Sequence, residues 1–141
     1  LTTKVNKYLW QQGWFLQHQR LLKEISNRKG SRFIFSGDIH AIGASSIHQS
    51  EDLILEKEVK TFLVGPVSSS TGTWPSFARG ISADNPEYIS SEEIFPILEE
   101  NGFTFFRIKG DKATAEIISC GGHNPELQES GSIISNKRVE I

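Results

Sequence analysis

The chain has 141 residues, which is the usual length of one domain and is enough to bury a hydrophobic core. Its 15 Lys and Arg residues against 17 Asp and Glu residues give a net charge of −2, so no broad electrostatic attraction draws it to nucleic acid or to an anionic membrane. We therefore expect no nucleic acid as the main partner. No apolar run approaches the roughly 18 residues that a membrane span needs, so we also expect no membrane-spanning segment.

The chain contains no methionine and opens at Leu1, so we expect it to be part of a longer protein. Any secretion signal would then lie outside the sequence, which leaves the localisation open. The single cysteine, Cys120, has no partner for an internal disulfide. It is interpreted as a small apolar residue that closes a strand.

The first predicted elements are a helix and a strand. Residues 14–28 carry an apolar stripe at helical spacing, which predicts an amphipathic helix. The stripe consists of Phe15, His18, Leu22 and Ile25. After a glycine turn, residues 32–35 are apolar on both faces, which is typical of a central, fully covered strand. A helix that leads into a buried strand predicts an α/β core.

The rest of the chain alternates strand patterns with polar stretches. Residues 53–55 and 59–64 read as two short strands around a solvated charge run at 56–58. The serine-rich residues 43–50 predict a loop. The composition of residues 68–73 predicts a long surface loop.

Three further interpretations concern the last third of the chain. Residues 91–98 predict a short helix, kinked or cut short by Pro96. Two alternating runs, 103–109 and 112–118, flank a two-residue turn and predict a β-hairpin. Residues 121–141 have no clear periodicity and are left as an unassigned tail.

A polar hexapeptide, Ser-Gly-Asp-Ile-His-Ala at 36–41, directly follows the strand predicted at 32–35. Its Asp38 and His40 are two residues apart, and in an extended or barely turned backbone such residues project from the same side. A carboxylate oxygen and an imidazole nitrogen could therefore converge on one point. These are donors that divalent metals accept in proteins. The motif predicts a pair of metal ligands.

This motif and three other ordered blocks resemble the C-terminal third of the alkaline phosphatase D (PhoD-like) branch of the calcineurin-like metallophosphoesterases. Asp38 stands where most of that superfamily has the first His of Gly-His-x-His. The blocks are Trp14 with Gln-Arg-Leu-Leu at 19–22, Ser-Gly-Asp-Ile-His at 36–40, Gly-Pro-Val at 65–67 leading to Gly-Thr-Trp-Pro-Ser-Phe-Ala-Arg-Gly at 72–80, and Leu-Glu-Glu-Asn-Gly-Phe-Thr at 98–104.

The resemblance implies an α/β fold, a four-layer α/β-β/α sandwich with two facing sheets and a dinuclear metal centre at their edge. Residues 1–120 would be its C-terminal portion, ending in the β-hairpin. Asp38 and His40 match the last pair of metal ligands, and the two metals would be iron and calcium or other divalent ions. The substrate would be a small-molecule phosphate ester, either a monoester or a diester.

The family's earlier ligands have no counterpart in this chain, so we expect the intact protein to be active and the isolated chain to be inactive. Each metal ion needs four to six ligands, and two side chains do not supply them. The isolated chain would also expose the edge of the strand at 32–35, so self-association is expected.

Three other residues are candidates for the site. His48 lies in the serine-rich stretch 43–50, which could fold back and offer a general acid or a further ligand; the alternative is an exposed loop histidine. Trp74 and Arg79 could form a rim in which the guanidinium binds substrate phosphate through two hydrogen bonds. Their alternative is a packed loop with Arg79 paired to a carboxylate.

The leading hypothesis is therefore a metal-dependent phosphoesterase. A non-catalytic, truncated or degenerate domain that acts as a binding or structural module is the first alternative, because the missing ligands permit it. A small-molecule-binding α/β domain without hydrolytic activity is the second.

Overall fold

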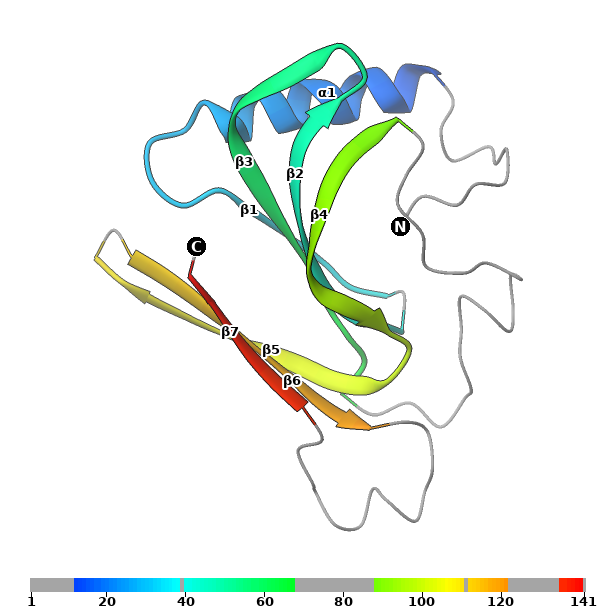
Figure 1. The fold of residues 1–141 in the computed structure, drawn as a ribbon, viewed down its shortest axis with the longest axis vertical. Helices are drawn as coiled ribbons and strands as arrows, with labels where there is room; N and C mark the ends of the chain where they lie inside the picture. The colour runs from blue at the N-terminus through cyan, green and yellow to red at the C-terminus, as the bar shows by residue number, and fades with distance from the viewer. Residues whose placement is uncertain (1–11, 39, 68–87, 111, 122–134, 141) are drawn as a thin grey trace.

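The computed structural model describes residues 12–38, 40–67, 88–110, 112–121 and 135–140 (Figure 1). Within them the chain forms one helix, α1 (Gln12–Ser26), followed by strands only. The strands are β1 (Phe33–Ser36), β2 (Ile42–Ser50), β3 (Leu53–Val64), β4 (Ile89–Leu98), β5 (Asn101–Lys109), β6 (Lys112–Gly121) and β7 (Ser135–Glu140).

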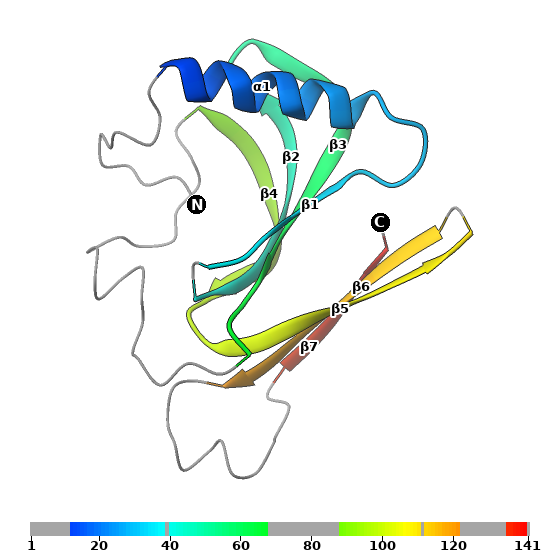
Figure 2. The same ribbon diagram turned by 180° about the vertical axis from the view of Figure 1, so that it is seen from behind.

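The strands form two sheets. A four-stranded sheet has the order β1-β3-β2-β4, and a three-stranded sheet has the order β5-β6-β7. β1 and β3 are parallel, and the other neighbouring pairs are antiparallel. Figures 1 and 2 show α1 on one side of the four-stranded sheet and the three-stranded sheet on the other. The described residues thus form three layers, and the two sheets diverge from the turn between β4 and β5.

The predicted α/β four-layer sandwich is wrong, because the described residues are mainly β with a single helix. The clearest difference lies at residues 91–98, which were expected to be a short helix and instead belong to β4. Pro96 is excluded from a helix interior, but an edge strand tolerates it. β4 is such an edge, and Pro96 falls where the pairing with β2 shifts register, between Phe95 and Leu98.

The loop predicted at residues 43–50 is also wrong, because this stretch makes up most of the central strand β2. Two of its serines, Ser45 and Ser46, are compatible with a central strand because their hydroxyls find partners on β3. The Ser45 and Thr61 hydroxyls are 2.8 Å apart, and Ser46 donates to Glu58 at 2.6 Å. A hydrogen-bonded hydroxyl can be buried at little cost, so a polar sequence serves as a central strand.

The remaining element predictions hold better. The helix and the hairpin with Gly110 in its turn are confirmed, as is a strand just before Gly37. The two short strands around the charge run are one continuous strand, β3, and the charged residues 56–58 are exposed on it as expected. The tail left unassigned contributes β7, which pairs with β6 and buries Val139.

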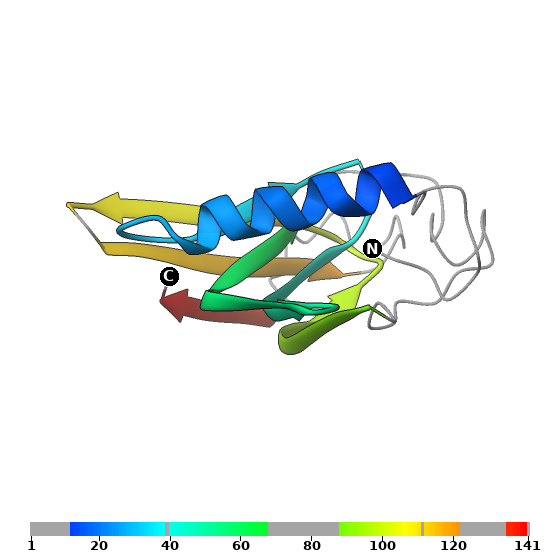
Figure 3. The same ribbon diagram turned by 90° about the horizontal axis from the view of Figure 1, so that it is seen from above.

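The helix packs its apolar stripe on the four-stranded sheet, and Figure 3 shows it lying obliquely over the strands. Leu22 is fully buried there with Val59 and Ile47. The buried Ser26 hydroxyl donates to the Lys57 carbonyl and accepts from the Lys57 amide, which fixes the end of α1 to β3. His18 is half-buried, and burial lowers the pKa of its imidazole. Among the described residues, no helix has the length and hydropathy that crossing a membrane requires.

Four phenylalanines join the two sheets on the opposite face. The Phe106 ring of β5 lies 3.9 Å from the Phe35 ring, 5.3 Å from the Phe62 ring and 6.4 Å from the Phe33 ring, measured between centroids. Phe62 is 1% exposed and belongs to the main core cluster, together with Ile42 and Ile117. Aromatic pairs at these separations add to the free energy of burial.

We predict that Phe62→Ala lowers the free energy of unfolding by about 3–5 kcal/mol, because it empties the centre of the aromatic cluster. Ile54→Ala is the control, since Ile54 lies on the same strand but is 75% exposed. The control should change stability by less than about 0.5 kcal/mol. Urea unfolding measures both, and equal losses would show that the cluster is not the centre of the core.

Candidate metal-binding loop

Asp38 and His40 lie on the short loop that joins β1 to β2. β1 ends at Ser36, and β2 begins at Ile42 and runs back along β3. Because β1 and β3 are parallel, their carboxyl ends lie at the same edge of the sheet. Figures 1 and 2 show the loop at this edge, beside the turn between β4 and β5. The carboxyl ends of parallel strands are where open sheets commonly bind ligands.

The backbone of this loop is left-handed at both candidate ligands. The φ angles are 70° at Asp38 and 54° at His40, and among the described residues only Glu51 is another non-glycine with positive φ. The loop is therefore a turn rather than the extended or barely turned backbone expected from the sequence. Asp and His tolerate this region better than most side chains, yet it still costs free energy compared with glycine.

The donors present fit part of a metal site. Asp38 is exposed and supplies a carboxylate, and the half-buried His40 supplies an imidazole two residues further along. Among the described residues, no three His, Cys, Asp or Glu side chains gather into a group that could hold a metal ion. Two donors fall short of the four to six ligands that each ion needs, so any further ligands must come from elsewhere.

His48 is not on a loop that folds back over this site. It lies on β2 in the half of the strand remote from His40, and the six residue steps from Ile42 to His48 span about 20 Å. Its Nε2 lies 3.8 Å from a Glu92 carboxylate oxygen on β4, and both side chains are largely exposed. The structure therefore separates His48 from Asp38 and His40.

His48 lies beside a polar network that the sequence did not suggest. Glu58 on β3 accepts hydrogen bonds from Lys60 at 2.5 Å and from Ser46 at 2.6 Å. Both hydrogen bonds lower the pKa of the Glu58 carboxyl, the one from Lys60 more than the one from Ser46. The sequence does contain a pattern that indicates this network, namely the alternating polar residues of β2 and β3. The pattern can be interpreted only after residues 43–50 are recognised as a strand.

Trp74 and Arg79, the predicted phosphate rim, lie outside the described residues. The nearest described residue before them is Val67, which follows the carboxyl end of β3. That end lies at the same edge of the sheet as the loop with Asp38 and His40.

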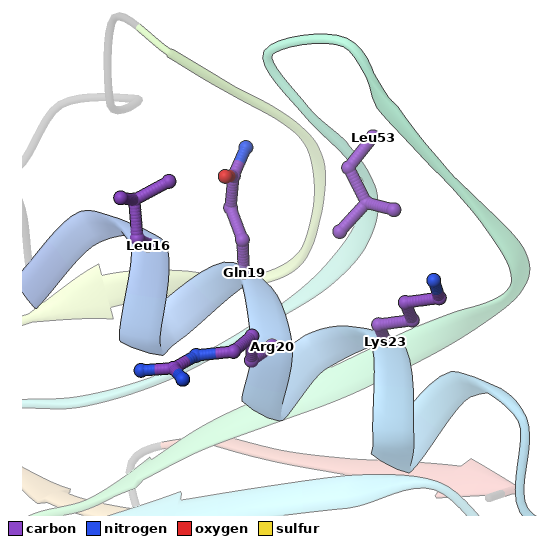
Figure 4. A pocket seen from close by; sticks show the side chains of 5 residues that line it. All are labelled: Leu16, Gln19, Arg20, Lys23 and Leu53. Atoms are coloured by element: carbon purple, nitrogen blue, oxygen red, sulfur yellow. The ribbon is translucent and has the colours of Figure 1, made fainter.

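A surface groove of about 510 Å³ lies on the α1 side of the molecule, away from this loop (Figure 4). It is lined by Leu16, Gln19, Arg20, Lys23 and Leu53, and Figure 4 shows Arg20 directed away from Leu53. Gln19 is fixed by a 2.8 Å hydrogen bond to the Ser50 carbonyl. The groove contains none of the predicted site residues.

No family model, no curated protein and no solved structure matches the chain. Its function is therefore inferred from the residues themselves and from their place in the fold.

We predict that Asp38→Gly and Glu51→Gly leave the free energy of unfolding unchanged or raise it by up to about 1 kcal/mol. Glycine removes the free-energy cost of the left-handed backbone in the folded state. Part of this gain in stability is lost again, because glycine also raises the conformational entropy of the unfolded chain. The two residues form a matched pair, because both are exposed carboxylates with positive φ. If urea unfolding shows a clear loss for Asp38→Gly alone, the Asp38 side chain is needed to build the turn.

Proposed function

We propose that the intact protein is a metal-dependent phosphoesterase and that Asp38 and His40 are the last ligands of its dinuclear metal centre. The observation that carries the proposal is the left-handed backbone at both residues, on one turn at the carboxyl end of β1. The resemblance of this motif to the PhoD-like metallophosphoesterases supports the same assignment. The missing ligands would come from parts of the protein outside the described residues.

The choice of residues on this turn favours a chemical role over a purely structural one. A turn that needs two left-handed residues is most easily built with glycine or asparagine. Here an aspartate and a histidine occupy the two positions, and each costs more than glycine would. Backbone strain of this kind gathers at functional sites, where the surrounding structure holds it in place.

The two side chains have complementary donor chemistry. The Asp38 carboxylate is a hard oxygen ligand, and the His40 imidazole is a nitrogen ligand for transition metals, so the pair suits iron, zinc or manganese alone or beside calcium. With one side of the pair held by Asp38 and His40, such ions would activate a water molecule as the nucleophile at neutral pH and would neutralise the charge of the phosphate oxygens. The role of Asp38 and His40 is to hold and orient one side of that centre.

Substrate binding is proposed for the segment that follows β3. It leaves the sheet at the edge where the loop with Asp38 and His40 lies, because β1 and β3 are parallel. In this proposal the Arg79 guanidinium contacts two oxygens of the substrate phosphate, and Trp74 contacts the apolar part of the ester. The substrate is a phosphomonoester or a phosphodiester.

The decisive experiment measures bound metal and turnover in the intact protein. Metal content is determined by elemental analysis. Turnover is assayed on an aryl phosphomonoester and on the matching diester, with and without added divalent metals. Bound metal together with metal-dependent hydrolysis would support the proposal. A protein that neither retains metal nor hydrolyses either ester would instead favour the non-catalytic binding or structural module.

We predict that Asp38→Ala and His40→Ala each lower metal affinity and turnover by more than about a hundredfold, because each removes a direct ligand. Mutation of a residue that only hydrogen-bonds to a ligand already lowers metal affinity by up to about a hundredfold. Circular dichroism should show that the fold is kept, since Asp38 is exposed and His40 only half-buried. Glu51→Ala is the control and should leave both quantities unchanged. Near-normal metal content and activity in both variants would refute the assignment.

A further inference from the structure

The outer face of the three-stranded sheet carries a row of aromatic and basic side chains. Side chains alternate along a strand, and Phe106 of β5 faces the four-stranded sheet, so the odd-numbered residues of β5 point outward. They are Phe103, Phe105, Arg107 and Lys109. The buried Ala113, Ala115 and Ile117 place the even-numbered residues of β6 on the same outer face. We call this surface the outer β5–β7 face.

Two aromatic rings are exposed on this face. Phe103 is 37% exposed and Phe105 is 48% exposed, although phenylalanine is among the residues most often buried. The guanidinium of Arg107 lies 5.1 Å from the centre of the Phe105 ring, so it is held over the same surface. No helix or sheet of the described residues packs on this side of the sheet (Figures 1 and 2).

The charge of this face differs in sign from that of the whole chain. By strand alternation and register it carries four exposed cations, and among the described side chains it carries the carboxylates of Glu116 and Glu140. The cations are Arg107, Lys109, Lys112 and Arg138. The face is therefore net positive, while the whole chain has a net charge of −2. A polyanion is attracted locally even though the molecule as a whole does not attract it.

We propose that the outer β5–β7 face binds single-stranded nucleic acid. Phe103 and Phe105 stack on unpaired bases. Arg107 and Lys109 continue the same row and contact the phosphates of the backbone that links and follows these bases. Aromatic side chains interleaved with cations on an open sheet face are what unpaired bases and their backbone require. An acidic peptide would satisfy the cations and leave the two rings without flat partners.

The proposal is tested on the intact protein with a fluorescein-labelled oligothymidylate of about fifteen nucleotides, a length suited to one small domain. Fluorescence anisotropy is measured from about 50 to 200 mM salt, with EDTA present so that the outcome is independent of any metal site. Saturable binding that weakens with salt is expected. No binding at the lowest salt would overturn the proposal without affecting the phosphoesterase assignment.

Variants on the two faces of β5 distinguish base stacking on the phenylalanine rings from electrostatic attraction of the oligonucleotide to the protein. Phe105→Leu keeps an apolar side chain but loses the flat ring, and we expect it to weaken binding about tenfold. Arg107→Ala should reduce the slope of log affinity against log salt by about 0.7. Ile108→Ala is the control, because Ile108 is 71% exposed on the opposite face of the same strand, and it should bind normally.

Two results would refute the proposal even if the oligonucleotide binds. One is unchanged affinity of both Phe105→Leu and Phe103→Ala, since the rings would then play no part. The other is equal competition by polyglutamate and by unlabelled oligothymidylate, since the face would then be a general anion surface. Circular dichroism of each variant establishes that a loss of affinity is not a loss of fold.

Discussion

Two glycines, one after β3 and one at the start of β5, let the two sheets approach closely, and the rest of the arrangement depends on this close approach. Gly65 follows β3 with φ of 72°, and Gly102 lies at the start of β5, where its amide donates to the Pro66 carbonyl at 2.8 Å. A Cβ atom on Gly102 would collide with the Ile118 carbonyl oxygen, and one on Gly65 would collide with the side chain of Ile42. Each Cβ would also crowd the other sheet, with that of Gly65 3.1 Å from the Gly102 carbonyl oxygen and that of Gly102 3.1 Å from the Ile42 side chain, so the close approach of the two sheets requires that neither position carries a side chain.

The position of this junction explains both the core and the candidate site. The sheets touch at one end and diverge toward the other, the four phenylalanines pack against one another between them, and Ile108 near the far end of β5 is 71% exposed. The loop with Asp38 and His40 lies at the junction end, where the edges of the two sheets come together. The outer β5–β7 face begins there with Phe103 and extends toward the hairpin turn at Gly110.

The local parts of this fold could be predicted from the sequence, and the non-local parts could not. The stripe of α1 and the alternation around Gly110 depend on neighbours close in the chain, so periodicity alone identifies them. β2 and β4 were missed because their residues suit strands only through partners elsewhere. Ser45 and Ser46 of β2 need Thr61 and Glu58, and Pro96 needs an edge position. For the candidate site, the spacing of Asp38 and His40 was readable, but the left-handed turn and the distance to His48 depend on the path of β2.

β1 forms one edge of the described four-stranded sheet and also leads into the loop with Asp38 and His40. Its residues are apolar on both faces, a pattern typical of a central strand in a sheet that is covered on both faces. Among the described residues, however, β1 pairs with β3 alone and Phe35 is 44% exposed. The loop that follows β1 carries the two proposed metal ligands, and a metal ion in a protein takes at least four. Within the described residues, an unpaired strand edge and the two proposed ligands therefore occur at the same place. A further strand paired with the free edge of β1 in parallel would cover Phe35 and bring its own carboxyl end, with any ligands there, beside Asp38 and His40.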